Sequence, residues 1–370
     1  MSVYKIFPTA DATIYSRFPT QNTGLDEILE VSVKNGINSI NYTVADVPSS
    51  PLLQDDIRRS LVAFSDQDIA IIEGFATGSW QAGLKLYLAN AENLETTYSI
   101  QVGEVASSWD RGVGKFTDYP PTTNGASWYN PNHYTGSANY WTGGVSSYYL
   151  TPGGGNWSGS FVEQFFSYKD SKDLNLDVTY IVNNWFSGSS NNRGFLVKLP
   201  IDVERDPTKF MALNFFSVDT HTIYPPTLEM RWDDSIYTTG SLSVINNNQF
   251  VVSIDNNLHN FKYNTGKYRF RVNSRDKYPV RNFSTSSVYT VNKALPRSSY
   301  WALQDLKSED MIVDYDTNYT KISCDTTGSY FDLYMTGLEP ERYYRILLKT
   351  VLPTGESIEF DNNNMFKIIR

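Results

Sequence analysis

Residues 176–195 read LDVTYIVNNWFSGSSNNRGF and carry the pattern that decides the fold. The apolar groups of this stretch stand three or four residues apart, at Val178, Ile181, Val182 and Trp185. That spacing is typical of one face of a helix. Gly188 suits the end of that helix, because glycine adopts the left-handed conformation in which many helices end. The stretch predicts one short helix between strands, with Val182 and Trp185 directed at the core.

The remainder of the chain has the composition and patterning of strands. Aromatic residues make up 15% of it, with 26 Tyr and 20 Phe, while charged residues make up only 19%. Such a balance favours strands, in which flat rings pack across neighbouring chains. In the segment 28–33, ILEVSV, the apolar residues Leu29, Val31 and Val33 alternate with others, so one face is apolar. We therefore predict an all-β protein whose N-terminal part is a jelly-roll β-sandwich.

The length of the chain predicts more than one domain. A chain of 370 residues exceeds the size at which a single core stops growing, roughly 250 to 300 residues. The composition changes after Asp234, where Asn-rich turns begin to separate the strands. We predict a first domain over residues 1–235, able to fold alone, and an immunoglobulin or fibronectin III-like β region over 236–370, as one domain or two small ones. In the segment 337–350, GLEPERYYRILLKT, a Tyr is expected to brace a corner.

A long segment inside the first domain, residues 110–172, contains no readable regular element. It is rich in Gly, Pro and Asn, and it carries the most distinctive side chains of the chain, Trp128, Tyr129, Tyr134, Tyr140, Trp141, Tyr148, Tyr149 and Trp157. Such rings can stack on sugars, anchor a protein interface or fold the insertion onto its own domain. We expect them on the surface, as candidates for an interface or a glycan site. The Gly-rich part, GGGNWSGS, is expected to be a flexible tip.

The net charge and the hydropathy of the chain reduce the number of partners that we expect. A formal net charge of -9 gives no long-range attraction for phosphate backbones, so we expect no nucleic-acid partner. No apolar run approaches the ~18 residues that cross a membrane, so no membrane partner is expected. The first residues, MSVYKIFPT, lack the basic start and apolar core of a signal peptide, which predicts a protein made in a cytoplasm.

Motifs for metal binding and catalysis are weak. Asp314, Asp316, Asn318 and Asp325 have the spacing of a calcium loop. Tyr319, however, occupies the place where that loop needs glycine, so a strand-turn-strand is the favoured interpretation. The single cysteine, Cys324, and three isolated histidines do not suggest a nucleophile or a metal cluster. We therefore predict no cofactor, no metal and no enzymatic activity.

A family resemblance covers about residues 1 to 235. Its blocks occur in order: DATIYSRFPTQNTGLDEILEVSV (11–33), RSLVAFS (59–65), AGLKLYLANAE (82–92), YSIQVGEVASSWD (98–110), GASW (125–128), the helix stretch above and PPTLEMRW (225–232). This order resembles the DNRLRE domain, related to carbohydrate-binding module family 96. The resemblance implies a jelly roll and gives a scaffold role to the family's motif residues, which fall here at Asp177, Val178, Thr179, Trp185, Gly188 and Gly194.

The resemblance leads to two functional hypotheses. Members of the family are modules of secreted or surface proteins, and some bind polysaccharides such as alginate. The C-terminal phrases, including LPRSSYWALQDLKSEDMIVDYD, are similar to virion proteins of marine contractile-tailed phages. The leading hypothesis is a non-enzymatic structural protein of a tailed-phage virion, at neck, tail or baseplate. Its partners would be other virion proteins and further copies of itself. The alternative is a polysaccharide-binding or host-adhesion module.

Overall fold

The computed structural model describes residues 2–34, 56–75, 78–133, 140–141, 153–206, 208–279 and 291–370. These residues form mostly antiparallel sheets, so the predicted all-β fold is confirmed. They divide into two compact units. The N-terminal unit comprises Ile6–Glu73 and Ala82–Glu229, and the C-terminal unit comprises Met1–Lys5, Gly74–Gln81 and Met230–Arg370. The prediction treated each domain as one continuous stretch, whereas each unit is assembled from separated stretches.

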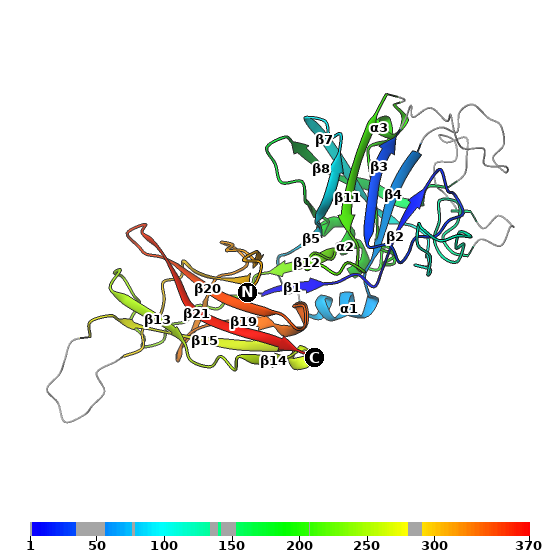
Figure 1. Ribbon diagram of the computed structural model, residues 1–370. Helices are drawn as coiled ribbons and strands as arrows, with labels where there is room; N and C mark the ends of the chain where they lie inside the picture. The colour runs from blue at the N-terminus through cyan, green and yellow to red at the C-terminus, as the bar shows by residue number, and fades with distance from the viewer. Residues whose placement is uncertain are drawn as a thin grey trace. The chain divides into compact units, whose positions relative to one another are not determined.

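An eight-stranded sheet is the main element of the N-terminal unit (Figure 1). Its order is β6 (Leu88–Glu92), β11 (Phe210–Phe216), β3 (Ile28–Lys34), β4 (Asp56–Ala63), β10 (Phe195–Lys198), β7 (Thr97–Val105) and β8 (Trp157–Ser167), with β2 (Ala10–Tyr15) beside β4. The alternation predicted for β3 is present, because Leu29, Val31 and Val33 are buried. The strand β8 lies within the 110–172 segment, for which no regular element was predicted.

A second sheet has the order β1 (Ser2–Ile6), β12 (Thr227–Trp232), β5 (Trp80–Leu86) and β9 (Leu174–Asp177). The boundary between the two units falls inside β1, β5 and β12. Each of these strands therefore contributes residues to both units. This arrangement is the physical reason why a single boundary near residue 235 does not describe the division.

The predicted helix is α2 (Thr179–Phe186), which buries Ile181, Val182 and Trp185. The residues before it attach it to β5. The backbone N–H of Val178 donates to the carbonyl of Ala82, and the hydroxyl of Thr179 accepts from the N–H of Ala82. The carboxylate of Asp177 accepts from the N–H of Thr179 at 2.8 Å and so satisfies a donor at the helix start. These bonds fix the start of α2 to β5 through Val178 and Thr179 and order the first turn through Asp177.

Two further helices were not predicted. The helix α1 (Asp66–Phe75) follows Ser65, whose hydroxyl accepts from the N–H of Gln67. Asp66 and Asp68 lie in its first turn, where negative charge is favoured. The helix α3 (Ile201–Arg205) is only five residues long. The expectation of one helix was therefore wrong for the residues that the structure describes.

The C-terminal unit is a β-sandwich with one core. One sheet has the order β13 (Phe250–Ile254), β15 (Lys267–Asp276), β19 (Gly328–Tyr334) and β18 (Ser323–Asp325). The other has the order β14 (Asn260–Lys262), β21 (Ser357–Ile369), β20 (Tyr343–Val351), β16 (Ser299–Asp305) and β17 (Met311–Val313) (Figure 1). Counted from β13, this is the A-B-E-D and C-F-G order of an immunoglobulin-type sandwich, with two added strands, β14 parallel to β21 and β17 antiparallel to β16.

One buried cluster of the described residues fills this sandwich, and it includes Val3 and residues of every strand from β13 to β21 except β18. The hydroxyl of Tyr344, near the start of β20, donates to the carbonyl of Glu339 at 3.0 Å. This is the bond of a tyrosine corner, in which the ring lies in the core and the hydroxyl ties back a preceding turn. Tyr344 therefore has the bracing role expected for a Tyr in this segment.

Candidate functional site

The aromatic segment folds back onto the N-terminal unit. Trp128 and Trp141 are only 1% and 4% exposed. They belong to one cluster of buried residues, which consists of Ile14, Ile57, Leu61, Val105, Ala126, Trp128, Trp141 and Leu196. The expectation that these two rings lie on the surface was wrong. The physical reason is that β4, β7 and β10 present an apolar patch on one face, and the segment covers it.

The other rings of the predicted set lie around this cluster. Tyr129 and Tyr140 meet edge to face with centroids 5.5 Å apart, and both are partly buried. Trp157 is partly buried beside Phe161, with centroids 5.3 Å apart. Tyr134, Tyr148 and Tyr149 lie outside the described residues. Three roles were considered for these rings. The ring positions in the structure agree with one of them, in which the insertion folds onto its own domain.

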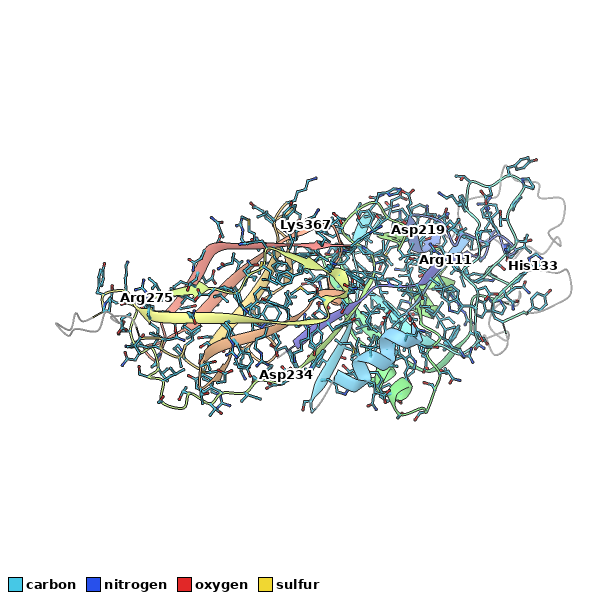
Figure 2. The ribbon with its side chains drawn as sticks, turned by 90° about the horizontal axis from the view of Figure 1, so that it is seen from below. Arg111, His133, Asp219, Asp234, Arg275 and Lys367 are labelled. Atoms are coloured by element: carbon cyan, nitrogen blue, oxygen red, sulfur yellow. The ribbon has the colours of Figure 1, made fainter. Side chains whose placement is uncertain are left out.

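Side-chain amides hold the first part of this segment in place. The amide nitrogen of Asn22 donates to the carbonyls of Arg111 and Ala126, while its oxygen accepts from the N–H of Gly114. Arg111 also forms an ion pair with Asp219, and the two side chains are labelled in Figure 2. Backbone groups that no strand pairs are satisfied here by side chains.

A buried charged cluster lies next to Trp128. The guanidinium of Arg59, fully buried, donates to both carboxylate oxygens of Glu204 at 3.0 and 2.7 Å. It also donates to the carbonyl of Gly154 and lies over the ring of Trp128. Lys198 lies 3.7 Å from Glu204, and burial lowers the pKa of its amine to about 8. The Gly-rich stretch is therefore a packed support around Arg59 and not the flexible tip that was expected.

A groove of about 660 Å³ opens on the same unit, beside this cluster. It is lined by β7, β8, α3 and β11 together with flanking residues, which are Glu95, Thr97, Tyr98, Ser99, Gln101, Glu163, Phe165, Phe166, Ser167, Asp170, Pro200, Asp202, Val203 and Met211. β7 and β11 are not neighbours in the sheet, and Pro200 and α3 complete the lining. Figure 1 shows β7, β8, β11 and α3 at one end of this unit.

Acidic and aromatic side chains determine the chemistry of the groove. Its lining includes the carboxylates of Glu95, Glu163, Asp170 and Asp202. Phe165 on β8 is 76% exposed. Burial and the nearby charge of Asp170 raise the pKa of Tyr98 to about 12. A hollow with these groups can attract a cation, accept hydrogen bonds from hydroxyls or amines, and stack a flat or charged group on an aromatic ring.

The calcium candidates lie in the C-terminal unit, where their carboxylates have other partners. Asp316 accepts from the backbone N–H groups of Asn318 and Tyr319, which closes a turn. Asp325 accepts hydrogen bonds from Thr327 and from the guanidinium of Arg271, and these bonds, those from Thr327 first, lower the pKa of its carboxyl to about 2 against the opposing effect of burial. Asp314 accepts only from the N–H of Tyr315 among the described residues. Within the described part of the chain, no three His, Cys, Asp or Glu side chains are arranged to hold a metal ion.

Over the same described ranges, no helix has the length and apolar character needed to span a bilayer.

Comparison with known protein families and with curated proteins finds no match to this chain. The similarity to the DNRLRE domain and to phage virion proteins therefore remains an expectation from the sequence.

Sequence reasoning missed the groove and the buried charged cluster. The groove combines β7, β8, α3 and β11, and Arg59 meets Glu204 across 145 residues of sequence. Such contacts have no local signature. One signal was available in the segment 161–168, FVEQFFSY, where three Phe and a Tyr accompany a single charge in a strand-like run.

Proposed function

We propose that this chain is a non-enzymatic structural protein of a tailed-phage virion, placed at the neck, tail or baseplate, that acts by docking to other virion proteins. The sequence resemblance supports the virion setting. The observation that carries the docking function is β8, an 11-residue strand that ends its sheet and leaves Phe165 and Tyr168 beside it 76% and 70% exposed.

Such a strand is suited to docking for two physical reasons. An edge strand presents unpaired backbone groups, which another chain can pair with. Large exposed rings are the side chains that most often contribute the binding energy of protein interfaces. β8 combines an edge position in its sheet with two exposed rings next to a groove.

The test is incorporation into particles. A host supplies either the wild-type chain or the Phe165→Ser, Tyr168→Ser double variant to phage that lack the gene, and purified particles are probed for the chain. The matched control is Tyr119→Ser with Tyr278→Ser, because those rings are 97% and 72% exposed at other places. We expect loss of incorporation for the first variant only. Particles without the wild-type chain would refute the virion proposal.

The alternative function, polysaccharide binding, is favoured by the groove. Hydroxyl and amide side chains, Thr97, Ser99 and Gln101, line it beside an exposed ring, an arrangement that suits a sugar. Its carboxylates disfavour anionic polymers such as alginate, because like charges repel. Retardation of the purified chain in gels that contain neutral or anionic polysaccharides measures this directly. Retardation that the Phe165→Ser, Tyr168→Ser variant abolishes, with normal incorporation, would reverse the ranking.

A further inference from the structure

The strand β8 is a long free edge. It has 11 residues, and β7 is the one strand with which it pairs in the described part of the chain. The other described strands that pair with one strand only have three to six residues, and they are β1, β2, β6, β9, β13, β14, β17 and β18. In β2, moreover, the hydroxyl of Thr23 bonds both the N–H and the carbonyl of Thr13. Because proteins usually keep edge strands short or covered, β8 is the exception.

The pairing of β7 shows which backbone groups of β8 face the open side. The N–H of Val105 donates to the carbonyl of Gly194, which directly precedes β10, so Val105 bonds on the β10 side. Successive residues of a strand bond to opposite sides. Tyr98, Ile100 and Val102 therefore bond to β8, where their partners stand at even-numbered positions.

The odd-numbered residues Glu163 and Phe165 thus direct their N–H and C=O groups to the open side. None of these groups has a hydrogen bond to a described residue. The turn after β8 closes the next such residue, Ser167, whose N–H donates to the carboxylate of Asp170 and whose carbonyl accepts from the N–H of Asp170. Two donors and two acceptors therefore remain for a partner.

The side chains around these groups favour association. β8 contains no Lys or Pro, and Glu163 is its single charged residue. The carboxylate of Glu163 accepts from the hydroxyl of Ser99 on β7, which holds the charge over its own sheet. Phe165, on the same face of β8, is 76% exposed. Open backbone groups and a large exposed ring thus occur together, without the charges that usually protect an edge.

We propose that β8 pairs antiparallel with β8 of a second copy of this chain, about a two-fold axis at Gln164, so that the two eight-stranded sheets join at their edges. In this register Glu163 lies opposite the partner's Phe165, and Phe165 lies opposite the partner's Glu163. Each of these pairs exchanges two N–H···O=C bonds, so all four open groups of each copy are satisfied. The proposal rests on the docking role proposed for β8 and names its partner.

The same register suits the side chains. It makes the two Phe165 rings diagonal neighbours on one face of the joined sheet, about 7 to 8 Å apart at the backbone and within reach of each other. Gln164 is held against β9 of its own copy, because its amide oxygen accepts from the N–H of Asn175 at 2.8 Å. Its side chain therefore needs no partner across the axis.

Neighbouring registers fit less well. An axis at Glu163 would place two carboxylates directly opposite each other, where like charges are unfavourable. An axis at Phe165 would place Glu163 opposite Ser167, whose backbone groups are closed by the turn. An axis at Val162 would place Phe165 opposite Gly159, which has positive φ and lies where the register with β7 shifts. Of these registers, the axis at Gln164 uses all four open groups without such a conflict.

The experiment measures the mass of the full chain by sedimentation equilibrium at about 1 to about 300 μM, the range in which small interfaces dissociate. Phe165→Pro removes an N–H that β7 does not use, a change that an edge strand tolerates. Phe165→Ser is the matched variant, because it removes the ring and keeps the N–H. Thermal unfolding of both variants verifies that the fold is kept.

We expect the wild-type chain to form dimers. The dissociation constant should rise about 3-fold for Phe165→Ser and about 10-fold or more for Phe165→Pro, because the proline also removes two of the four bonds. Equal effects of the two variants would reduce the contact to the ring and overturn the backbone pairing. A wild-type chain that stays monomeric over the whole range would overturn it as well.

A disulfide tests the register independently of these variants. Gln164→Cys places two thiols at a pair without hydrogen bonds, where the Cα atoms are about 4.5 Å apart, and oxidised glutathione can accept their two electrons. The control is Ser160→Cys, an exposed position of β8 whose two copies would lie eight residues, or about 26 Å, apart. We expect a covalent dimer for Gln164→Cys only. Equal yields for the two variants would overturn the register.

The two proposals fail separately. Particles that contain the wild-type chain, together with a chain that is monomeric in solution, would defeat self-pairing and leave the virion function standing. Loss of Phe165→Pro from particles in that case would assign the edge to a different protein. Particles that lack the wild-type chain would defeat the virion function, whereas sedimentation of the purified chain would still report whether β8 pairs with itself.

Discussion

The indole N–H of Trp185 donates to a carboxylate oxygen of Glu104 at 2.9 Å, in the interior of the N-terminal unit. The ring of Trp185 packs on Phe195 with centroids 5.0 Å apart. The helix α2 is thus fixed to β7 by a charge-assisted bond and to β10 by ring packing. Trp185→Ala is expected to destabilise the protein by about 3 to 5 kcal/mol, the usual loss for a large buried aromatic. Urea unfolding measures it.

A milder change separates the bond from the packing. Trp185→Phe keeps much of the apolar area and leaves the carboxylate of Glu104 with the hydroxyl of Ser158, 3.2 Å away. The expected cost is about 1 to 3 kcal/mol, because a buried charged acceptor loses a donor. Tyr180→Ala on the exposed face of α2 is the control and should change stability by less than about 0.5 kcal/mol. A Trp185→Ala cost below about 1 kcal/mol would contradict the buried position.

Variants of Gly188 and Gly194 allow the cost of backbone strain alone to be compared with the cost of strain and overpacking together. Both have positive φ, 68° and 81°, in the region that L side chains rarely adopt. A Cβ at Gly188 would meet nothing within 4 Å, whereas at Gly194 it would lie 2.2 Å from the carbonyl oxygen of Val62. Gly188→Ala should therefore cost about 1 to 2 kcal/mol from strain alone. Gly194→Ala should cost a further 1 to 3 kcal/mol, approximately, from overpacking. Equal unfolding midpoints for the two variants would contradict this difference.

Asp11 links stability to pH. It is buried in β2, accepts from the N–H of Val218 at 2.6 Å, and burial raises the pKa of its carboxyl to about 7. The unfolded state loses this proton near pH 4, while the folded state retains it to about pH 7. Stability from this group is therefore fully present below about pH 4 and is lost as the pH rises to about 7.

The variant Asp11→Asn isolates this effect, because the amide keeps an acceptor for Val218 and cannot ionise. The unfolding free energy of the variant should rise relative to the wild type between pH 4 and pH 7 and level off above. Asp26, whose pKa burial raises to about 6, is present in both proteins and cancels in the comparison. A difference that stays constant over this range would exclude Asp11 as the titrating group.

The buried pair of Arg59 and Glu204 should couple strongly. Glu204→Gln leaves Arg59 and Lys198 buried without their anion, which is expected to cost about 3 to 5 kcal/mol. Arg59→Met should cost a similar amount. The double variant should lose less than the sum of the two, since no cation–anion pair remains to be broken at that position. Strict additivity would show that the two side chains act independently.

The hydroxyl of Tyr344 provides a prediction for the C-terminal unit. Tyr344→Phe removes only the bond to the carbonyl of Glu339 and should cost about 1 kcal/mol in unfolding free energy. Tyr343→Phe is the control, because Tyr343 is its neighbour on the exposed face of β20. An unfolding free energy that Tyr344→Phe leaves unchanged would show that the tyrosine corner does not stabilise this unit.

Local patterns predicted the fold where one element contained its own signal. The spacing of Ile181, Val182 and Trp185 was sufficient to predict α2, and the repeat of apolar residues at every second position of 28–33 was sufficient to predict β3. The helix α3 was not predicted because five residues are too few to show the helical period of apolar side chains. The strand β8 was not predicted because large apolar residues occur on both of its faces. Phe165 is exposed on one face, and Phe166 is buried on the other.

The candidate site was beyond such patterns. Trp128 and Trp141 are of a residue type that is common in binding surfaces. They belong to the core because they cover an apolar face of the sheet. Conversely, Tyr98 belongs to an ordinary alternating strand. The pKa of its hydroxyl depends on burial and on the charge of Asp170, which comes from a distant part of the sequence.

The order in which the chain is synthesised leaves β1 without some of its packing partners during translation. Val3 belongs to the core that β20 and β21 complete, and Tyr4 packs edge to face on Tyr334, with centroids 5.6 Å apart. These residues leave the ribosome long before Tyr334, β20 and β21 do. At an elongation rate of roughly 5 to 20 residues per second, β1 stays without those partners for tens of seconds. A nascent N-terminal unit released early would carry these two apolar side chains uncovered, which makes the start of β1 the segment where chaperone binding during translation should be sought.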